Sequence, residues 1–181
     1  MVARVNRQIL LKSRPEGAPS LDNFALKQGS VPEPGDGEVL MRTHWLSLDP
    51  YMRSRMSAAK SYAKPVEVGA TMVGGTVGEV VASRNPSFAV GDIAVGYGGW
   101  QDYAVASGSG LRKLNPAAVP VSTALGVLGM PGMTAYAGLL EIGRPKAGET
   151  VAVAAASGAV GSVVGQIARP IRCWPPSQPA S

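Results

Sequence analysis

Short runs rich in apolar residues fill residues 8–118, and clusters of Gly, Pro, Asp and Ser separate the runs. The strands are predicted at residues 7–11, 23–28, 38–48, 71–83 and, as two strands around the Gly98–Gly99 turn, within 90–107. Short strands in succession, without a helix of any length, indicate a small, partly closed β-barrel.

The pattern changes after about Pro120. Residues 122–143 have helical spacing in two pieces, with a break at Gly129–Gly132. Residues 150–155 then form a continuous apolar run, which is typical of a strand buried on both faces of a parallel sheet. Apolar positions at helical spacing follow over 158–168. The second part of the chain therefore predicts two linker helices and then one strand–turn–helix unit.

The turn between the predicted strand and helix reads Ala156, Ser157, Gly158, Ala159, Val160, Gly161. Against the dinucleotide-binding pattern G-x-G-x-x-G, Ala156 replaces the first glycine, while Gly158 and Gly161 keep the second and third. The second glycine lets the backbone approach a pyrophosphate, and N–H groups at the helix start then meet it. We predict that residues 157–161 bind the cofactor pyrophosphate. Simple helix–sheet packing also accounts for small residues here, and that alternative stays open.

The rest of a dinucleotide site has no counterpart after this turn. No Asp or Glu follows Glu149, although an acidic residue about 20 positions after the glycines binds the ribose of NAD. Four prolines in the last 13 residues oppose a second interior strand. Arg169 and Arg172 are interpreted as solvated charges.

Composition excludes several classes of protein. The net charge of +5 comes from scattered basic residues, so we predict no nucleic-acid partner. One cysteine and one histidine, Cys173 and His44, cannot supply a Cys/His zinc centre, and His44 is expected to be structural. No apolar run approaches the roughly 20 residues of a membrane span. We interpret residues 7–11 as a strand and not as part of a targeting peptide, and we expect a cytoplasmic protein without a membrane partner.

Five blocks in order carry a resemblance to a known family: residues 46–56, 73–81, 90–103, 125–151 and 154–168. Together they resemble the zinc-independent medium-chain dehydrogenase/reductases, in the branch of the NADPH-dependent curcumin reductases and leukotriene B4 dehydrogenases (prostaglandin reductases). The resemblance implies a mainly β GroES-like barrel at residues 1–118. It also implies linker helices and the first strand and helix of an α/β Rossmann domain at 119–168. A Pro/Ser-rich tail at 169–181 departs from the family pattern.

The resemblance also implies a chemistry. Members of the branch reduce the C=C bond of α,β-unsaturated ketones and aldehydes with a hydride from NADPH, and the developing enolate oxygen needs a hydrogen-bond donor. By position in the matching blocks, Tyr51 and Tyr62 are the predicted catalytic residues that line the substrate cleft. An anchored core aromatic is the alternative for Tyr51.

Four further residues take roles from the same blocks. Tyr97 and Trp100 are predicted to form an apolar wall that binds substrate, although an ordinary aromatic hairpin explains them equally well. Met130 and Thr134 are predicted to lie near the nicotinamide, with helix packing and a helix-start hydroxyl as alternatives. Arg53 is expected to face solvent.

Residues 119–181 number 63, whereas one βαβ unit takes about 30 or more, so a six-stranded Rossmann sheet does not fit. We therefore expect an incomplete, inactive reductase with weak NADP(H) binding. A reading frame that changed near Ala168 is our hypothesis, and a genuine short protein with a linker tail is the alternative. A second function class is a non-catalytic GroES-like module that binds a partner or oligomerises, and full-length relatives are expected to include homo-oligomers.

Overall fold

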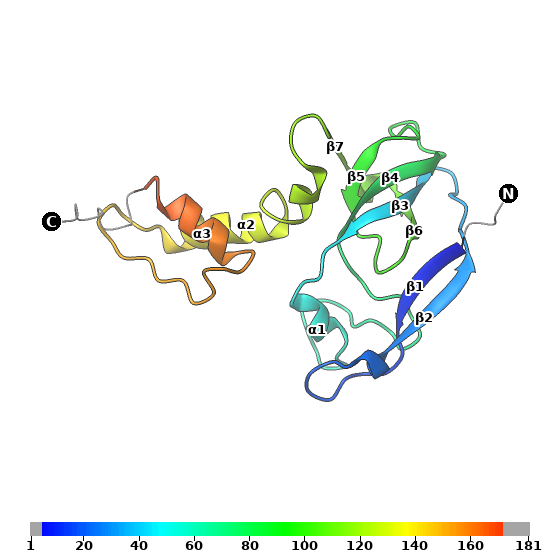
Figure 1. Cartoon of the computed structure of the whole chain (residues 1–181), viewed down its shortest axis with the longest axis horizontal. Helices are drawn as coiled ribbons and strands as arrows, with labels where there is room; N and C mark the ends of the chain where they lie inside the picture. Colours follow the sequence, from blue (N-terminus) through cyan, green and yellow to red (C-terminus); the bar gives the residue numbers. More distant parts are fainter. Residues whose placement is uncertain (1–4, 172–181) are drawn as a thin grey trace. The chain divides into compact units, whose positions relative to one another are not determined.

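The structure is a computed structural model that describes residues 5–171 (Figure 1). The chain divides into two compact units, residues 1–121 (unit 1) and 122–181 (unit 2). The domain boundaries expected from the sequence stay a prediction. Most of the predicted tail, with Arg172 and Cys173, lies outside the described residues.

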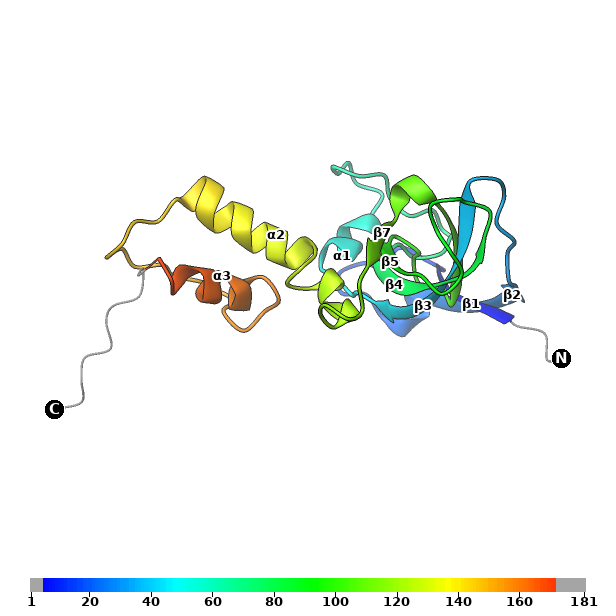
Figure 2. The same ribbon diagram turned by 90° about the horizontal axis from the view of Figure 1, so that it is seen from above.

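Unit 1 is built from seven strands in two sheets (Figures 1 and 2). The elements in chain order are β1 (Val5–Leu11), η1 (Leu21–Asn23), β2 (Phe24–Ser30), β3 (Glu38–Leu46), α1 (Tyr51–Arg55), β4 (Thr76–Ser83), β5 (Ile93–Gly96), β6 (Tyr103–Ser107), η2 (Gly108–Gly110) and β7 (Arg112–Leu114). β1 and β2 form an antiparallel pair, and the other strands form a sheet in the order β6-β3-β4-β5-β7. The mainly β architecture predicted from the short apolar runs and the turn residues between them is confirmed.

The structure corrects three details of the predicted strands. Of the predicted strand 71–83, only residues 76–83 form β4, while Thr71 makes an isolated bridge to Leu10. The strands on either side of Gly98–Gly99 do not form a hairpin, because β5 pairs with β4 and β7 whereas β6 pairs with β3. β7 was not predicted, since its three residues are too few to show a period.

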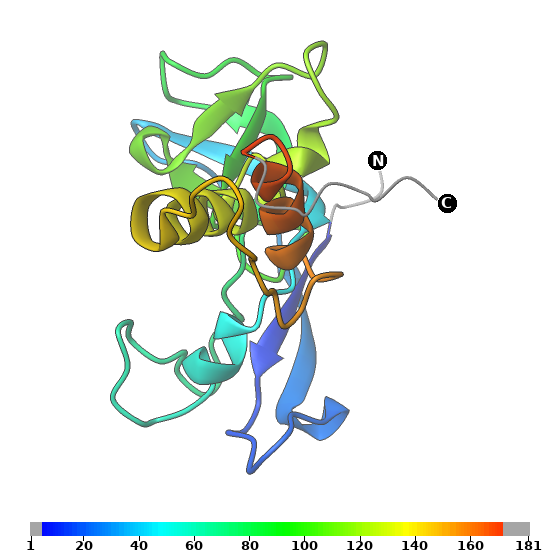
Figure 3. The same ribbon diagram turned by 90° about the vertical axis from the view of Figure 1, so that its left-hand side faces the viewer.

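β1 lies beside β2 (Figure 3), and a seam of hydrogen bonds joins β1 to residues 69–72 and 99–103, the segments that lead into β4 and β6 of the larger sheet. The Ile9 N–H donates to the Trp100 carbonyl at 2.9 Å, and the Met72 N–H donates to the Ile9 carbonyl at 2.9 Å. The side chain of buried Asn6 acts as a further rung, since its amide exchanges two 2.9 Å hydrogen bonds with the Tyr103 backbone. The two sheets therefore form one partly closed barrel.

Two apolar clusters fill unit 1, one at the seam and one inside the larger sheet. The seam cluster consists of Leu11, Met52, Met56, Val66 and Met72, and the sheet cluster of Val39, Met41, Val80, Phe88 and Ala94. Three consecutive buried residues, 39–41, break strict alternation in β3, and a register shift against β4 falls between Leu40 and Met41. A bulge of this kind bends a strand and redirects its side chains.

Unit 2 is helical in the described residues. It contains η3 (Val121–Leu125), α2 (Met130–Tyr136), a π-helical continuation η4 (Ala137–Gly143) and α3 (Gly161–Ala168). The predicted break at 129–132 is the start of α2, where Pro131 occupies a first-turn position that has no need of an N–H. α2 lies beside α3 (Figure 2), and Leu139 packs with Ala168 between the two helical segments.

The predicted strand 150–155 is not formed. Residues 151–153 have no regular secondary structure, and residues 154–160 are exposed turns. An apolar parallel strand is stable when neighbouring strands pair with it and helices cover both of its faces. The described part of unit 2 offers no such neighbour, and Val151 instead packs against the Leu139–Ala168 cluster.

Replacing Asn6 tests the seam. Asn6→Ala removes both hydrogen bonds to Tyr103 and leaves a buried backbone donor and acceptor unpaired, so we expect the free energy of unfolding to fall by about 2 kcal/mol. Urea unfolding followed by circular dichroism measures the change. Asn115→Ala is the control, because that amide caps only an exposed turn through the Ala117 N–H. Equal, small decreases in the free energy of unfolding of the two variants would show that Asn6 does not stabilise the seam.

The ion pair at the seam gives a pH-dependent test. Arg7 Nε lies 2.7 Å from Asp102 Oδ2, and this hydrogen bond lowers the pKa of the Asp102 carboxyl, while burial opposes the shift. A carboxyl whose pKa is lowered by folding stabilises the folded state at pH values above its unfolded-state pKa of about 3.9. This stabilisation is lost as the pH falls through the folded-state pKa. Asp102→Asn should therefore destabilise the protein at pH 7, and its difference from wild type should shrink below about pH 4. Denaturant unfolding over a pH series measures this, and a constant difference would refute it.

Candidate functional site

Tyr51 is the first residue of α1, a helix of five residues that begins directly after Pro50. Met52 and Met56 turn one side of this helix into the seam cluster, and the half-buried Tyr51 ring packs against the same cluster. The sequence explains this placement, because proline ends pairing after β3 and its fixed φ suits a helix start. Tyr51 is thus partly anchored in the core, as the alternative from sequence had it, while its side chain keeps some exposure.

The Tyr51 phenol lies in the electrostatic neighbourhood of two other predicted site residues. Burial raises the pKa of Tyr51, and Asp49, Tyr97 and Tyr62 raise it further, whereas Arg55 opposes them. Tyr97 is 79% exposed and Tyr62 is 80% exposed. Tyr62 and Tyr97 therefore lie close enough to Tyr51 to affect its ionisation, and Tyr51, protonated at neutral pH like an ordinary phenol, is able to donate a hydrogen bond.

Trp100 has a different environment from Tyr97. Its ring stacks on Phe24 with centroids 5.6 Å apart and packs against the seam cluster. The indole Nε1 is buried and has no hydrogen-bond partner among the described residues. The aromatic hairpin considered for these residues is absent, and Trp100 is half-buried against the seam cluster while Tyr97 is exposed. A substrate role for the two side chains stays a prediction.

The turn at residues 157–161 belongs to unit 2, and its third glycine is required by a close approach. A Cβ at Gly161 would lie 2.1 Å from the Ala155 carbonyl oxygen and 3.0 Å from the Ala156 Cα. Gly158 is less crowded, with the Ala155 oxygen 3.2 Å from a Cβ position. Gly161 therefore lets the helix start approach the preceding segment, which is the packing role expected of the last glycine in the motif.

The start of α3 presents backbone donors. The first hydrogen bonds of the helix run from the Ser162 N–H to the Gly158 carbonyl and from the Val164 N–H to the Val160 carbonyl. The N–H groups of residues 159–161 donate no hydrogen bond within the described part of the chain. Free N–H groups at a helix start, with the helix dipole behind them, fit an anionic diphosphate.

Met130 and Thr134 both lie in α2. The Thr134 hydroxyl donates to the Met130 carbonyl at 2.8 Å, so it serves its own helix, close to the alternative considered from sequence. Met130 is 45% exposed and belongs to no apolar cluster of the described residues. Roles near a nicotinamide stay predictions for both.

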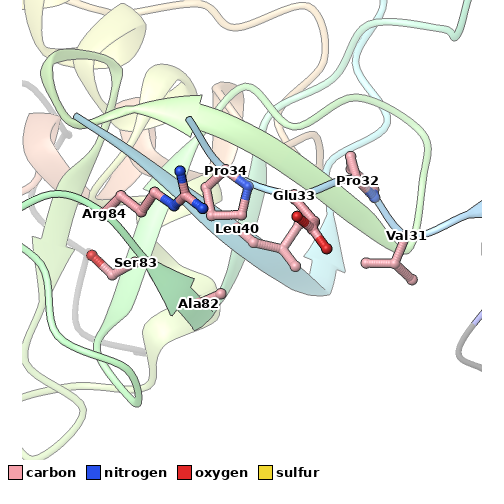
Figure 4. A pocket seen from close by; sticks show the side chains of 8 residues that line it. All are labelled: Val31, Pro32, Glu33, Pro34, Leu40, Ala82, Ser83 and Arg84. Carbon is pink, nitrogen blue, oxygen red and sulfur yellow. The ribbon is translucent and has the colours of Figure 1, made fainter. Parts of the chain in front are cut away.

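Unit 1 has two cavities whose walls include none of Tyr51, Tyr62 and Tyr97. One, of about 430 Å³, lies between the proline-containing segment 31–34 and the end of β4, with Glu33 and Arg84 at its wall (Figure 4). The other, of about 400 Å³, is lined by residues of β1, β2, β3 and the segment 100–102. Of the predicted site residues, only Trp100 lines either cavity.

Two further polar residues whose environment was predicted from the sequence, Arg53 and His44, both have partners in the structure. Arg53, which was expected to face solvent, is half-buried, and its guanidinium donates to the carbonyls of Gly17 and Pro15 at the surface. Hydrophobic periodicity carries no signal for such contacts, whose acceptors are backbone atoms 36 and 38 positions away. His44 lies 3.7 Å from Glu79 on the neighbouring strand and edge-on to Trp45, as a structural residue would. In the described residues, no group of three or more His, Cys, Asp or Glu gathers to hold a metal.

Comparison with known proteins decides the family. Residues 7–114 match the family described as the N-terminal domain of oxidoreductase. The chain is 57% identical over 164 residues to the NADPH-dependent curcumin reductase of Escherichia coli (strain K12), with 91% of this chain and 48% of that protein covered. It is 48% identical over 162 residues to prostaglandin reductase 1 of Rattus norvegicus, with 88% and 47% covered.

The chain belongs to the medium-chain dehydrogenase/reductases. Its similarity to the curcumin and prostaglandin reductases confirms the zinc-independent branch that the sequence blocks indicated. The crystal structure of CurA in complex with NADPH from Vibrio vulnificus superposes with a TM-score of 0.88 at 56% identity, over 92% of this chain and 50% of that one.

This medium-chain reductase sequence spans about half the length of the curated relatives that it matches. Within residues 5–171, no helix is long and apolar enough to cross a bilayer.

A pair of glycine substitutions in α3 tests the turn. Gly161→Ala places a methyl group against the Ala155 carbonyl and should destabilise the start of α3, with faster amide exchange over residues 158–165. Gly165→Ala is the matched control, because nothing lies within 4 Å of its Cβ position and alanine stabilises an exposed helix by about 1 kcal/mol. Hydrogen exchange followed by NMR measures both. Faster exchange in both variants, or in neither, would contradict the close approach at Gly161.

Proposed function

We propose that this chain carries the substrate-facing tyrosines and the pyrophosphate turn of an NADPH-dependent reductase that acts on the C=C bond of α,β-unsaturated ketones and aldehydes. The observation that carries the proposal is its 57% identity to an NADPH-dependent curcumin reductase, over a stretch that includes both groups of residues. The influence of Tyr62 and Tyr97 on the pKa of half-buried Tyr51 is in keeping with the proposal.

In this proposal the start of α3 binds the cofactor, and the tyrosines bind the substrate. The free N–H groups of residues 159–161 hold the diphosphate of NADPH, and Gly158 and Ser157 line the same exposed turn. When bound, reduced nicotinamide supplies a hydride for the β-carbon of the substrate. The Tyr51 phenol, which is protonated at neutral pH like any tyrosine with an ordinary pKa, donates a hydrogen bond to the carbonyl oxygen as negative charge develops there. Exposed Tyr62 and Tyr97 contact the apolar part of the substrate.

For a polypeptide of residues 1–181 alone, we propose weak NADPH binding and no turnover. The turn offers donors to a diphosphate, but the segment before it, 150–155, forms no strand and residues 154–160 are exposed. No acidic residue after Glu149 is present to bind a ribose. A diphosphate held by backbone groups alone leaves the nicotinamide without a fixed position.

Two arms of one experiment test the function. Calorimetric titration of the 181-residue protein with NADPH should give a dissociation constant well above the micromolar range, and NADPH oxidation with a simple enone should be undetectable. A chimera in which residues 1–168 replace the matching half of CurA from Vibrio vulnificus should oxidise NADPH with the same enone. In the chimera, Tyr51→Phe should lower kcat about a hundredfold, whereas Tyr103→Phe, a buried residue of β6, should leave it unchanged.

The outcomes separate the two claims. Micromolar NADPH binding or enone reduction by the 181-residue protein would overturn the proposed inactivity. A folded chimera that binds NADPH but leaves the enone unreduced would overturn the assigned reaction.

A second candidate is a non-catalytic module that binds a partner or oligomerises. Exposed apolar residues of the α2–η4 region favour it, since Met133 is 67% and Ile142 is 81% exposed. A defined dimer in sedimentation would support this candidate, and a polydisperse aggregate would oppose it. Homo-oligomers of longer relatives and a cytoplasmic location belong to the same set of proposals.

A further inference from the structure

The helix that carries Tyr51 is too short to be stable by itself. Fixing the first turn of a helix is unfavourable, and helices below about 12 residues need outside contacts to persist. α1 has five residues, and its core-facing side is anchored by Met52 and Met56. The outer side of α1 also needs contacts, because the direction of the Tyr51 side chain depends on the rotation of the helix about its axis.

Arg53 fixes α1 to the loop between β1 and η1, residues 12–20. Its Nε donates to the Gly17 carbonyl at 2.9 Å, and its Nη2 donates to the same oxygen at 2.6 Å and to the Pro15 carbonyl at 3.2 Å. Gly17 has φ +78°, a conformation that favours glycine. This turn lets two carbonyls from one loop converge on one guanidinium.

Arg14 makes the opposite contact, from the loop to the helix. Its Nη1 donates to the carbonyl of Met56, the residue that caps the end of α1, at 2.9 Å. Arginine near a helix end satisfies carbonyls that have no partner within the helix. The loop and the helix therefore hold each other through two arginines that point in opposite directions. Figure 1 shows α1 and this loop at the same end of unit 1.

We infer that Arg53 and Arg14 are positioning residues for Tyr51, which clamp α1 to the loop 12–20 and so set the orientation of the phenol toward substrate. That the phenol faces substrate rests on the proposed function. The contacts that clamp α1 to the loop lie within unit 1 and do not depend on it. The guanidinium is needed because its planar fork reaches two carbonyls at once, and an ammonium lacks that geometry.

Tyrosines labelled with ¹³C at Cζ provide the test, since the chain has five and each resonance is assigned by a Tyr→Phe variant. In Arg53→Met, the Tyr51 resonance should move at pH 7. Its ionisation midpoint should fall toward the ordinary value of about 10, because the ring loses burial and moves away from Asp49, Tyr97 and Tyr62, all of which raise the pKa. The Tyr103 resonance should stay in place. Arg53→Lys should give an intermediate shift.

Arg7→Met is the matched control, because Arg7 binds Asp102 next to Tyr103 at the seam. It should move the Tyr103 resonance and leave Tyr51 unchanged. A folded Arg53→Met protein with an unchanged Tyr51 resonance and midpoint would overturn the inference. If Arg53→Met does not fold, Arg14→Met, which loses one hydrogen bond, decides by the same criterion. The readout uses neither NADPH nor substrate, so a failed reaction assignment leaves this result standing.

Discussion

The pairing of β1 with residues 69–72 and 99–103 is the constraint on which unit 1 depends. A two-stranded ribbon is marginally stable in water by itself, and the larger sheet has an open edge at β6. Backbone hydrogen bonds, the buried Asn6 amide and the Arg7–Asp102 pair join the two across that edge. Asn6 matters most in this set, since a buried amide that matches the Tyr103 backbone in both directions admits one register only.

The proposed chemistry follows from the space that this pairing encloses. Leu11 and Met72 come from the two sides of the seam, and Met52 and Met56 of α1 fill the volume between them. Tyr51 thus sits on a helix whose inner side is core and whose outer side is held by a loop. A half-buried phenol so held has a fixed direction, which is what a donor to a developing oxyanion requires.

The sequence predicted elements well and their partners poorly. Turn residues on either side of short apolar runs located β1 to β6, because both signals are local in the sequence. These signals did not reveal that β6 lies beside β3 and β5 beside β4, since the Gly98–Gly99 turn looks like any hairpin turn. The apolar run 150–155 was predicted as a buried strand, because its composition is typical of a strand inside a complete parallel sheet. The described residues contain no such sheet, and the strand is not formed. Tyr51, Tyr62 and Tyr97 came from family motifs, while Arg53 and Arg14 left no local signal, because backbone carbonyls carry no sequence code.

The separation in sequence of the groups that meet at the seam has a kinetic consequence. Asn6 and Tyr103 are 97 positions apart, so their contact requires the closure of almost the whole of unit 1. Contacts of such long range form slowly, because loop-closure entropy opposes them until the intervening strands are in place. The cavity that receives α1 is completed by this late event. An ordered Tyr51 helix therefore marks a finished barrel, and partly folded chains expose a tyrosine segment without a defined shape.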